Sequence, residues 1–143
     1  MRYLFSAVLV AALAVSGCKS SDSPTGPTDP SVGLSLPFSA TDVTVGTGAE
    51  ATNGRTVSMQ YSGWLYHPSA PENKGPSFDS GVFNFVLGTT VIAGWNQGIP
   101  GMRVGGTRRL VIPPSLGYGP NGSPPRIPGN ATLLFEVALL AVQ

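Results

Sequence analysis

Closely spaced glycines and prolines limit this chain to short elements of secondary structure. The 143 residues include 19 glycines and 14 prolines, which follow no Gly-X-Y period of the collagen type. Because proline interrupts helices and sheet interiors while glycine favours turns, a bundle of long helices is excluded. The length suits one compact domain better than two. The sequence therefore favours a single turn-rich domain.

Apolar residues that alternate with polar ones indicate half-buried strands between these turns. The clearest stretch covers residues 56–66, where Val57, Met59 and Tyr61 fall on one face. Residues with high β propensity favour strands in four other stretches, namely 41–45, 82–87, 107–112 and 133–142. We expect the first of these four strands to lie at an edge of the sheet.

One stretch, residues 91–99, has the spacing of a short helix. Trp95 and Ile99 lie four residues apart, and Pro100-Gly101 follows as a stop signal. Strands without regular helical crossovers, together with one helix, indicate an α+β domain. We therefore predict that residues 37–143 form an antiparallel β-sheet of about five strands wrapped around one short α-helix.

The N-terminus has the pattern of a secretory signal over residues 1–17, with a basic start and an apolar run over 4–15. The run is shorter than the roughly 20 residues of a membrane-spanning helix, so we expect cleavage. The segment Val15-Ser16-Gly17-Cys18 resembles the bacterial lipobox, in which the cysteine becomes the acylated first residue. This resemblance implies a lipid-anchored protein of the bacterial cell envelope. Lys19, in place of an aspartate, implies the outer membrane, facing the periplasm.

A low-complexity segment follows the cysteine. Residues 19–36 read KSSDSPTGPTDPSVGLSL, which contains too little apolar surface to offset the conformational entropy lost on folding. We predict that residues 18–36 form a disordered tether that begins at the acylated Cys18. The functional part of the chain is then the domain over 37–143.

The residue inventory excludes several kinds of site. A single cysteine, Cys18, and a single histidine, His67, cannot build a disulfide framework or a Cys/His zinc site, so we expect no metal. The glycines of 101–106 lack the G-x-G-x-x-G spacing of a dinucleotide site, and we expect no cofactor. A net charge of +1 without clusters of lysine and arginine argues against nucleic-acid binding. A glycosidase would need two facing carboxylates, but only Asp79 lies among aromatic residues.

Aromatic residues spread over different predicted strands and loops carry the strongest signal. They are Tyr61, Phe78, Phe83, Phe85, Trp95, Tyr118 and Phe135. Six segments around them occur in order along the domain: MQYSGWL (59–65), FDS (78–80), FNFVLG (83–88), VIAGW (91–95), GYG (117–119) and IPGNATLLF (127–135). In content and order they resemble the FKBP family, the macrolide-binding peptidyl-prolyl cis-trans isomerases. Each segment alone is weak evidence for the family, whereas six segments in the family order and at nearly the family spacing are strong evidence.

The resemblance implies a binding pocket with four catalytic residues. Trp95 would form its floor, and Asp79 would pair with Tyr61 near the prolyl imide. Tyr118 and the backbone N–H of Ile92 would donate hydrogen bonds to substrate carbonyls. Substrate-binding walls and rim are implied at Phe78, Phe83, Val91, Ile92, Ile127 and Phe135. For Phe85, ordinary core packing is the favoured interpretation.

The implied activity fits the empty catalytic inventory. Rotation about an X-Pro bond meets a barrier of about 18–20 kcal/mol, because amide resonance is lost, but it needs no nucleophile, metal or proton removal. The implied partners are proline-containing proteins or peptides that fold in the cell envelope, macrolide inhibitors, and the membrane through the lipid anchor. We expect a monomer.

Two alternatives remain at this point. One is a non-catalytic binding module or chaperone that holds proline-containing or apolar segments in the same cleft. The other is a structural lipoprotein domain of sandwich type that shares only the strand pattern.

Two positions depart from the family pattern. Only three residues separate Asp79 from Phe83, where many family members have a longer bulge with an arginine that pairs with the aspartate, and no arginine lies nearby in this sequence. Arg126 stands where the family usually has an apolar rim residue. The substrate preference is therefore expected to differ from that of other members.

Overall fold

The computed structural model describes residues 36–89 and 91–143. The predicted signal segment, Cys18 and nearly all of the predicted tether lie outside these residues. The elements are β1 (Ser39–Thr44), β2 (Thr56–Tyr66), β3 (Lys74–Val86), α1 (Ala93–Gly98), β4 (Thr107–Ile112) and β5 (Leu133–Val142), with short 3-10 turns at Pro71–Asn73, Pro114–Leu116 and Gly119–Asn121. No helix in the described part of the chain is long and apolar enough to cross a membrane.

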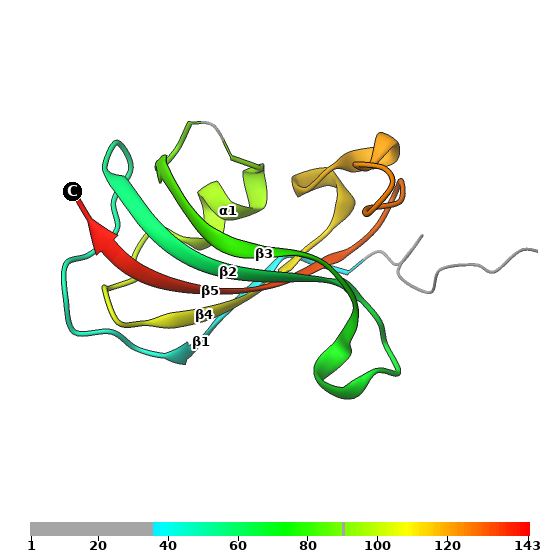
Figure 1. Ribbon diagram of the computed structural model, residues 1–143, viewed down its shortest axis with the longest axis horizontal. Coiled ribbons are helices and arrows are strands. Elements are labelled where there is room, and N and C mark those ends of the chain that lie inside the picture. Colours follow the sequence, from blue (N-terminus) through cyan, green and yellow to red (C-terminus); the bar gives the residue numbers. More distant parts are fainter. Residues whose placement is uncertain (1–35, 90) are drawn as a thin grey trace, which may run out of the picture.

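The five strands form one sheet in the order β1-β4-β5-β2-β3, and every neighbouring pair is antiparallel. Figure 1 shows this twisted sheet with α1 against one face and with the segment after β4, in orange, on the same side. The predicted α+β fold is therefore confirmed, as is the edge position of β1.

Two elements differ in length from the prediction. β3 begins at Lys74 rather than near residue 82, because its pairing with β2 continues past Asp79 to Lys74. Gly75 and Pro76 are residues that disfavour strands, so the sequence gives no sign of this extension. An outermost strand with irregular register tolerates them. The helix is shorter than predicted, because Ile92 has an extended backbone and only Ala93–Gly98 is helical.

Two glycines allow α1 to lie unusually close to β4. A Cβ atom on Gly94 would lie 2.6 Å from Cγ2 of Ile112, and one on Gly98 would lie 2.6 Å from Cδ2 of Leu110. Because the two glycines are four residues apart, they occupy the same face of the helix. The guanidinium of Arg108 on β4 then donates a 2.6 Å hydrogen bond to the carbonyl oxygen of Gly98. The sheet therefore fixes both the depth and the C-terminal end of the helix.

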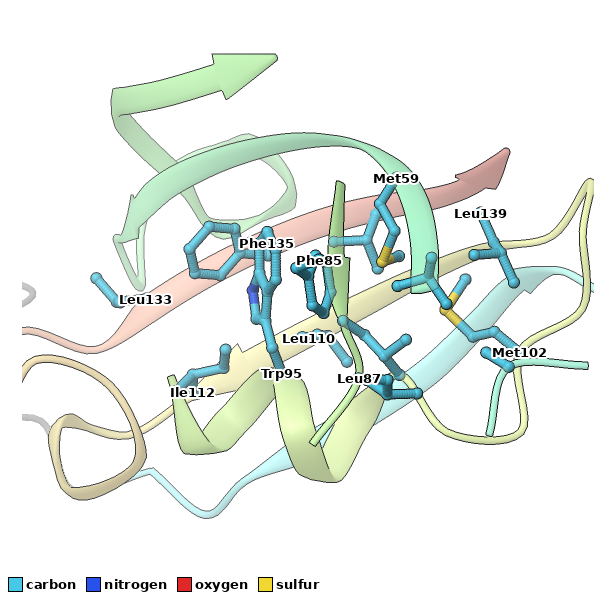
Figure 2. Close-up of a cluster of buried hydrophobic side chains, with 14 of the residues drawn as sticks. Met59, Phe85, Leu87, Trp95, Met102, Leu110, Ile112, Leu133, Phe135 and Leu139 are labelled. Carbon is cyan, nitrogen blue, oxygen red and sulfur yellow. The ribbon is translucent and has the colours of Figure 1, made fainter. Parts of the chain in front are cut away.

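The hydrophobic core lies between α1 and the face of the sheet that it covers. Its fully buried members include Val57, Met59, Leu87, Ile99, Leu110, Ile112, Leu133, Val137 and Leu139. Figure 2 shows the Trp95 indole rising from α1 toward Phe85 and Phe135, so that one helical side chain joins the core to the aromatic cluster.

Candidate functional site

A cavity of about 320 Å³ opens between α1, the sheet and the loop after β4. Its lining residues are Tyr61, Phe78, Asp79, Phe83, Val91, Ile92, Trp95, Tyr118 and Phe135. These are nine of the ten pocket residues that the sequence predicts, and they come from β2, β3, β5, α1 and two loops. The size is that of a small-molecule or peptide side-chain site.

Trp95 forms the centre of an aromatic cluster beneath this cavity. The indole is 5% exposed and meets Tyr61 and Phe135 edge to face, with ring centroids 5.4 and 5.3 Å away. Its Nε1 atom is buried and has no hydrogen-bond partner among the described residues. The Phe85 ring centroid lies 5.6 Å from that of the indole, on the core side, and Phe85 does not line the cavity. This agrees with its predicted role in the core. Edge-to-face contacts of this kind hold the rings in fixed relative positions.

The polar edge of the cavity is the pair formed by Tyr61 and Asp79. The Tyr61 hydroxyl donates to Oδ2 of Asp79 at 2.9 Å, and the backbone N–H of Ser80 donates to Oδ1 at 2.9 Å. No cation in the described part of the chain forms an ion pair with this carboxylate. Two hydrogen bonds therefore orient Asp79 without the arginine that many family members are expected to use.

Both phenols of the cavity keep their protons at neutral pH. Burial is the main cause that raises the pKa of Tyr61, followed by the hydrogen bond to Asp79 and the charge of its carboxylate. Burial also raises the pKa of Tyr118, and the Asp79 carboxylate raises it further. Each phenol is thus a neutral hydrogen-bond donor rather than a nucleophile or a base.

Two donors at the cavity are available for a ligand. Tyr118 is 41% exposed, and no described residue pairs with its hydroxyl. The backbone N–H of Ile92 likewise has no acceptor among the described residues, since Ile92 enters the hydrogen-bond pattern only through its carbonyl oxygen. Phe83, 45% exposed, adds an apolar ring to the lining of the same cavity.

Gly63 contributes to the site, although the sequence predicted no role for it beyond its place in the segment MQYSGWL. A Cβ atom there would lie 2.6 Å from Cζ of Phe78 and 2.8 Å from Cε1 of Phe135. These two rings pack edge to face with centroids 5.3 Å apart and line the cavity. A glycine inside a strand often marks a close approach of neighbouring groups, so its position in the predicted strand 56–66 was the sequence signal for this contact.

A second cavity of about 310 Å³ adjoins the first. It is lined by Phe78, Asp79, Tyr118, Ser123, Pro124, Pro125, Arg126 and Ile127, of which the first three also line the main cavity. Ile127, the tenth predicted pocket residue, lies here rather than in the main cavity. No arginine lies near Asp79 in the sequence, but the fold brings Arg126 next to Phe78, the residue before Asp79. Nη1 of Arg126 donates to the Phe78 carbonyl oxygen at 3.2 Å.

Other chemistry has little support in the described residues. His67 lies in the loop after β2, where Nδ1 accepts a hydrogen bond from the Ser69 backbone N–H. Within residues 36–89 and 91–143, no group of three or more His, Cys, Asp or Glu side chains could hold a metal ion.

Comparisons with known proteins place the chain in a family. Residues 48–140 match the model of the FKBP-type peptidyl-prolyl cis-trans isomerases. FK506-binding protein 4 of Rhizopus delemar is 46% identical over 107 residues, which cover 71% of this chain and 26% of that protein. Mouse peptidyl-prolyl cis-trans isomerase FKBP2 is 46% identical over 100 residues, which cover 66% of this chain and 66% of that protein.

A solved bacterial structure has the same fold. The peptidyl-prolyl cis-trans isomerase of Pseudomonas syringae pv. tomato aligns with a TM-score of 0.63 and 33% identity, covering 74% of this chain and 75% of that one. This chain spans between about a quarter and two thirds of the length of the two curated relatives above. The matched range includes every residue that lines the main cavity. On these grounds the chain belongs to the family of FKBP-type peptidyl-prolyl cis-trans isomerases.

Proposed function

We propose that the main cavity binds a proline ring of a protein substrate and accelerates the cis-trans isomerisation of the X-Pro bond that precedes it. The observation that carries this proposal is an apolar cavity floored by Trp95, with hydrogen-bond donors at its mouth. Such a site supplies what bond rotation needs, because the reaction requires neither a nucleophile nor a proton transfer.

Two physical effects lower the barrier in this arrangement. The apolar walls disfavour the charge-separated resonance form of the amide, which is the form that resists rotation. The Tyr118 hydroxyl and the Ile92 N–H, from two residues that line the cavity, would hold substrate carbonyls in a twisted geometry, so binding would favour the transition state over either planar ground state. A shortening of isomerisation from roughly 100 s to 10 ms corresponds to about 5.5 kcal/mol, within reach of a few hydrogen bonds and desolvation.

The direct test is the cis-to-trans rate of a Xaa-Pro tetrapeptide with the purified protein, with and without FK506, which the name of the Rhizopus relative suggests as a ligand. We expect an acceleration proportional to protein concentration that FK506 abolishes. A folded protein that leaves the rate at its uncatalysed value would overturn the proposed activity.

We also propose that the isomerase works in the bacterial cell envelope, anchored through acylated Cys18 in the outer membrane and facing the periplasm. The support is the sequence pattern of residues 1–18, with the polar segment 19–36 as a tether. Mass spectrometry of the mature N-terminus should find a diacylglyceryl-modified cysteine as the first residue. A Cys18→Ser variant should lose the acyl chains and leave the membrane fraction, and an unmodified N-terminus at Met1 would refute this localisation.

A second function, the holding of unfolded apolar segments, is supported by exposed apolar side chains on the strand that contributes Phe83 to the cavity. Val82, Phe83 and Val86 on the outermost strand β3 are 61%, 45% and 38% exposed. Suppression of client aggregation that persists with FK506 in the cavity would favour this holding function, whereas suppression that FK506 abolishes would assign both functions to one cleft.

A further inference from the structure

Arg126 is a cation without a carboxylate partner in the described structure. Lys74, Arg103, Arg108 and Arg109 all form ion pairs, but Arg126 is exposed and forms none with any described residue. One donor, Nη1, is tied to the Phe78 carbonyl oxygen at 3.2 Å. This hydrogen bond holds the guanidinium in the lining of the second cavity, while its other N–H groups have no partner within residues 36–89 and 91–143.

The second cavity lies where a residue next to the bound proline would fall. It shares Phe78, Asp79 and Tyr118 with the main cavity, so the two spaces meet along a common wall. An extended peptide advances about 3.5 Å per residue, so a neighbour of a proline in the main cavity can reach this space within one or two residues. Its side chain would then meet Arg126.

The only carboxylate at this wall is already engaged. Both oxygens of Asp79 accept hydrogen bonds, from the Tyr61 hydroxyl and the Ser80 N–H, and no ion pair joins Asp79 to Arg126. The cation of Arg126 is therefore available to a ligand. A planar guanidinium with free donors matches a carboxylate better than any neutral group.

We propose that Arg126 gives this protein a preference for X-Pro substrates with an acidic side chain adjacent to the proline. The inference rests on the proposed isomerase function and adds a substrate class to it. Pro124 and Pro125 form the apolar side of the same subsite, which suits the methylene stem of glutamate.

The test compares kcat/KM for tetrapeptides that differ in one side chain. Glutamate, glutamine and lysine are placed before the proline in one series and after it in another. For the wild-type protein we expect glutamate to exceed glutamine about two- to fivefold at one of the two positions, as for a partly exposed ion pair. Lysine should fall below glutamine there, and the preference should shrink as the salt concentration rises.

Substitutions at Arg126 and at a control arginine test whether the preference for glutamate depends on the Arg126 charge or on the net charge of the protein. Arg126→Gln should bring the ratio of glutamate to glutamine to about one, and Arg126→Lys should restore part of it. Arg55→Gln is the matched control, because Arg55 is exposed, lacks an ion pair, lines neither cavity and changes the net charge equally. Its ratio should equal that of the wild type.

The outcomes distinguish the two proposals. If all peptides are accelerated equally at both positions, or if Arg126→Gln keeps the wild-type ratio, the acidic preference is wrong and the isomerase function stands. If no peptide is accelerated by the folded protein, both proposals fail together.

Discussion

Tyr61 and Asp79 are joined diagonally across two strands rather than as direct neighbours. In the β2–β3 register Tyr61 faces Gly81, whereas Asp79 faces Gly63. The phenol nevertheless reaches Oδ2 of Asp79 at 2.9 Å, and it passes Gly81 without close contact, since even a Cβ atom there would lie 3.8 Å from the Tyr61 hydroxyl. A side-chain hydrogen bond at the main cavity thus adds to the backbone pairing between the outermost strand of the sheet and its neighbour.

A double-mutant cycle with Tyr61→Phe and Asp79→Asn should measure this link. We expect each single variant to lose about 0.5–1.5 kcal/mol of the free energy of unfolding, and the double variant to lose less than the sum. Urea titration gives these energies. Strict additivity would mean that the hydrogen bond contributes nothing in solution.

Tyr118→Phe should separate catalysis from stability. The hydroxyl has no partner in the part of the chain that the structure describes, so its removal should leave the free energy of unfolding within about 0.5 kcal/mol of the wild type. In the peptide assay kcat/KM should fall about two- to tenfold, as for the loss of one hydrogen bond to the transition state. An unchanged kcat/KM would remove Tyr118 from the proposed mechanism.

Gly63→Ala should deform the main cavity from beneath. The added methyl group would lie under 3 Å from the rings of Phe78 and Phe135, so we expect a loss of about 1–3 kcal/mol in unfolding free energy together with lower kcat/KM. Gly81→Ala is the control, because a Cβ atom there would have its nearest contact at 3.8 Å from the Tyr61 hydroxyl. Equal effects of the two variants would argue against the steric account.

The ion pair between Asp42 and Arg108 should make stability depend on acid pH. Nε of Arg108 lies 2.6 Å from Oδ1 of Asp42, and this hydrogen bond, more than the charge itself, lowers the pKa of the aspartate. A lowered folded-state pKa gives stability that is present above the unfolded value of about 4 and is lost as the pH falls through the folded value.

Asp42→Asn should therefore cost about 0.5–1 kcal/mol at pH 7, and the difference from the wild type should vanish well below pH 4. Denaturant unfolding at both pH values measures it. Glu50→Gln is the comparison, because Glu50 lies 3.9 Å from Arg103 with both side chains half exposed, and its effect should be smaller.

Local patterns in the sequence were sufficient for most of the fold. The alternation around Val57 and Met59 predicted β2, and the four-residue spacing of Trp95 and Ile99 before Pro100-Gly101 predicted the helix that presents Trp95. The full length of β3 escaped prediction because Gly75 and Pro76 act as local breakers. Only the long-range pairing with β2 shows that the strand continues through them.

The candidate site likewise has a part that the sequence predicted and a part that it did not. Nine cavity residues were named from motifs whose order reflects the family resemblance. The contact of Arg126 with Phe78 joins residues 48 positions apart, and the closeness of Gly63 to two rings depends on how strands pack. A glycine within a strand pattern can indicate a close approach, but the two rings that approach Gly63 and the partner of Arg126 are identified only in the folded chain.

The walls of the main cavity come from β2, β3, α1, β5 and the loops between them, so the cavity does not exist in the unfolded chain. Any ligand of this cavity binds the folded state alone and shifts the unfolding equilibrium by mass action. At a free concentration of about 100 times Kd that shift amounts to about 2.7 kcal/mol. The melting temperature of this protein should therefore rise with the concentration of any ligand of the main cavity, and that rise reports the affinity.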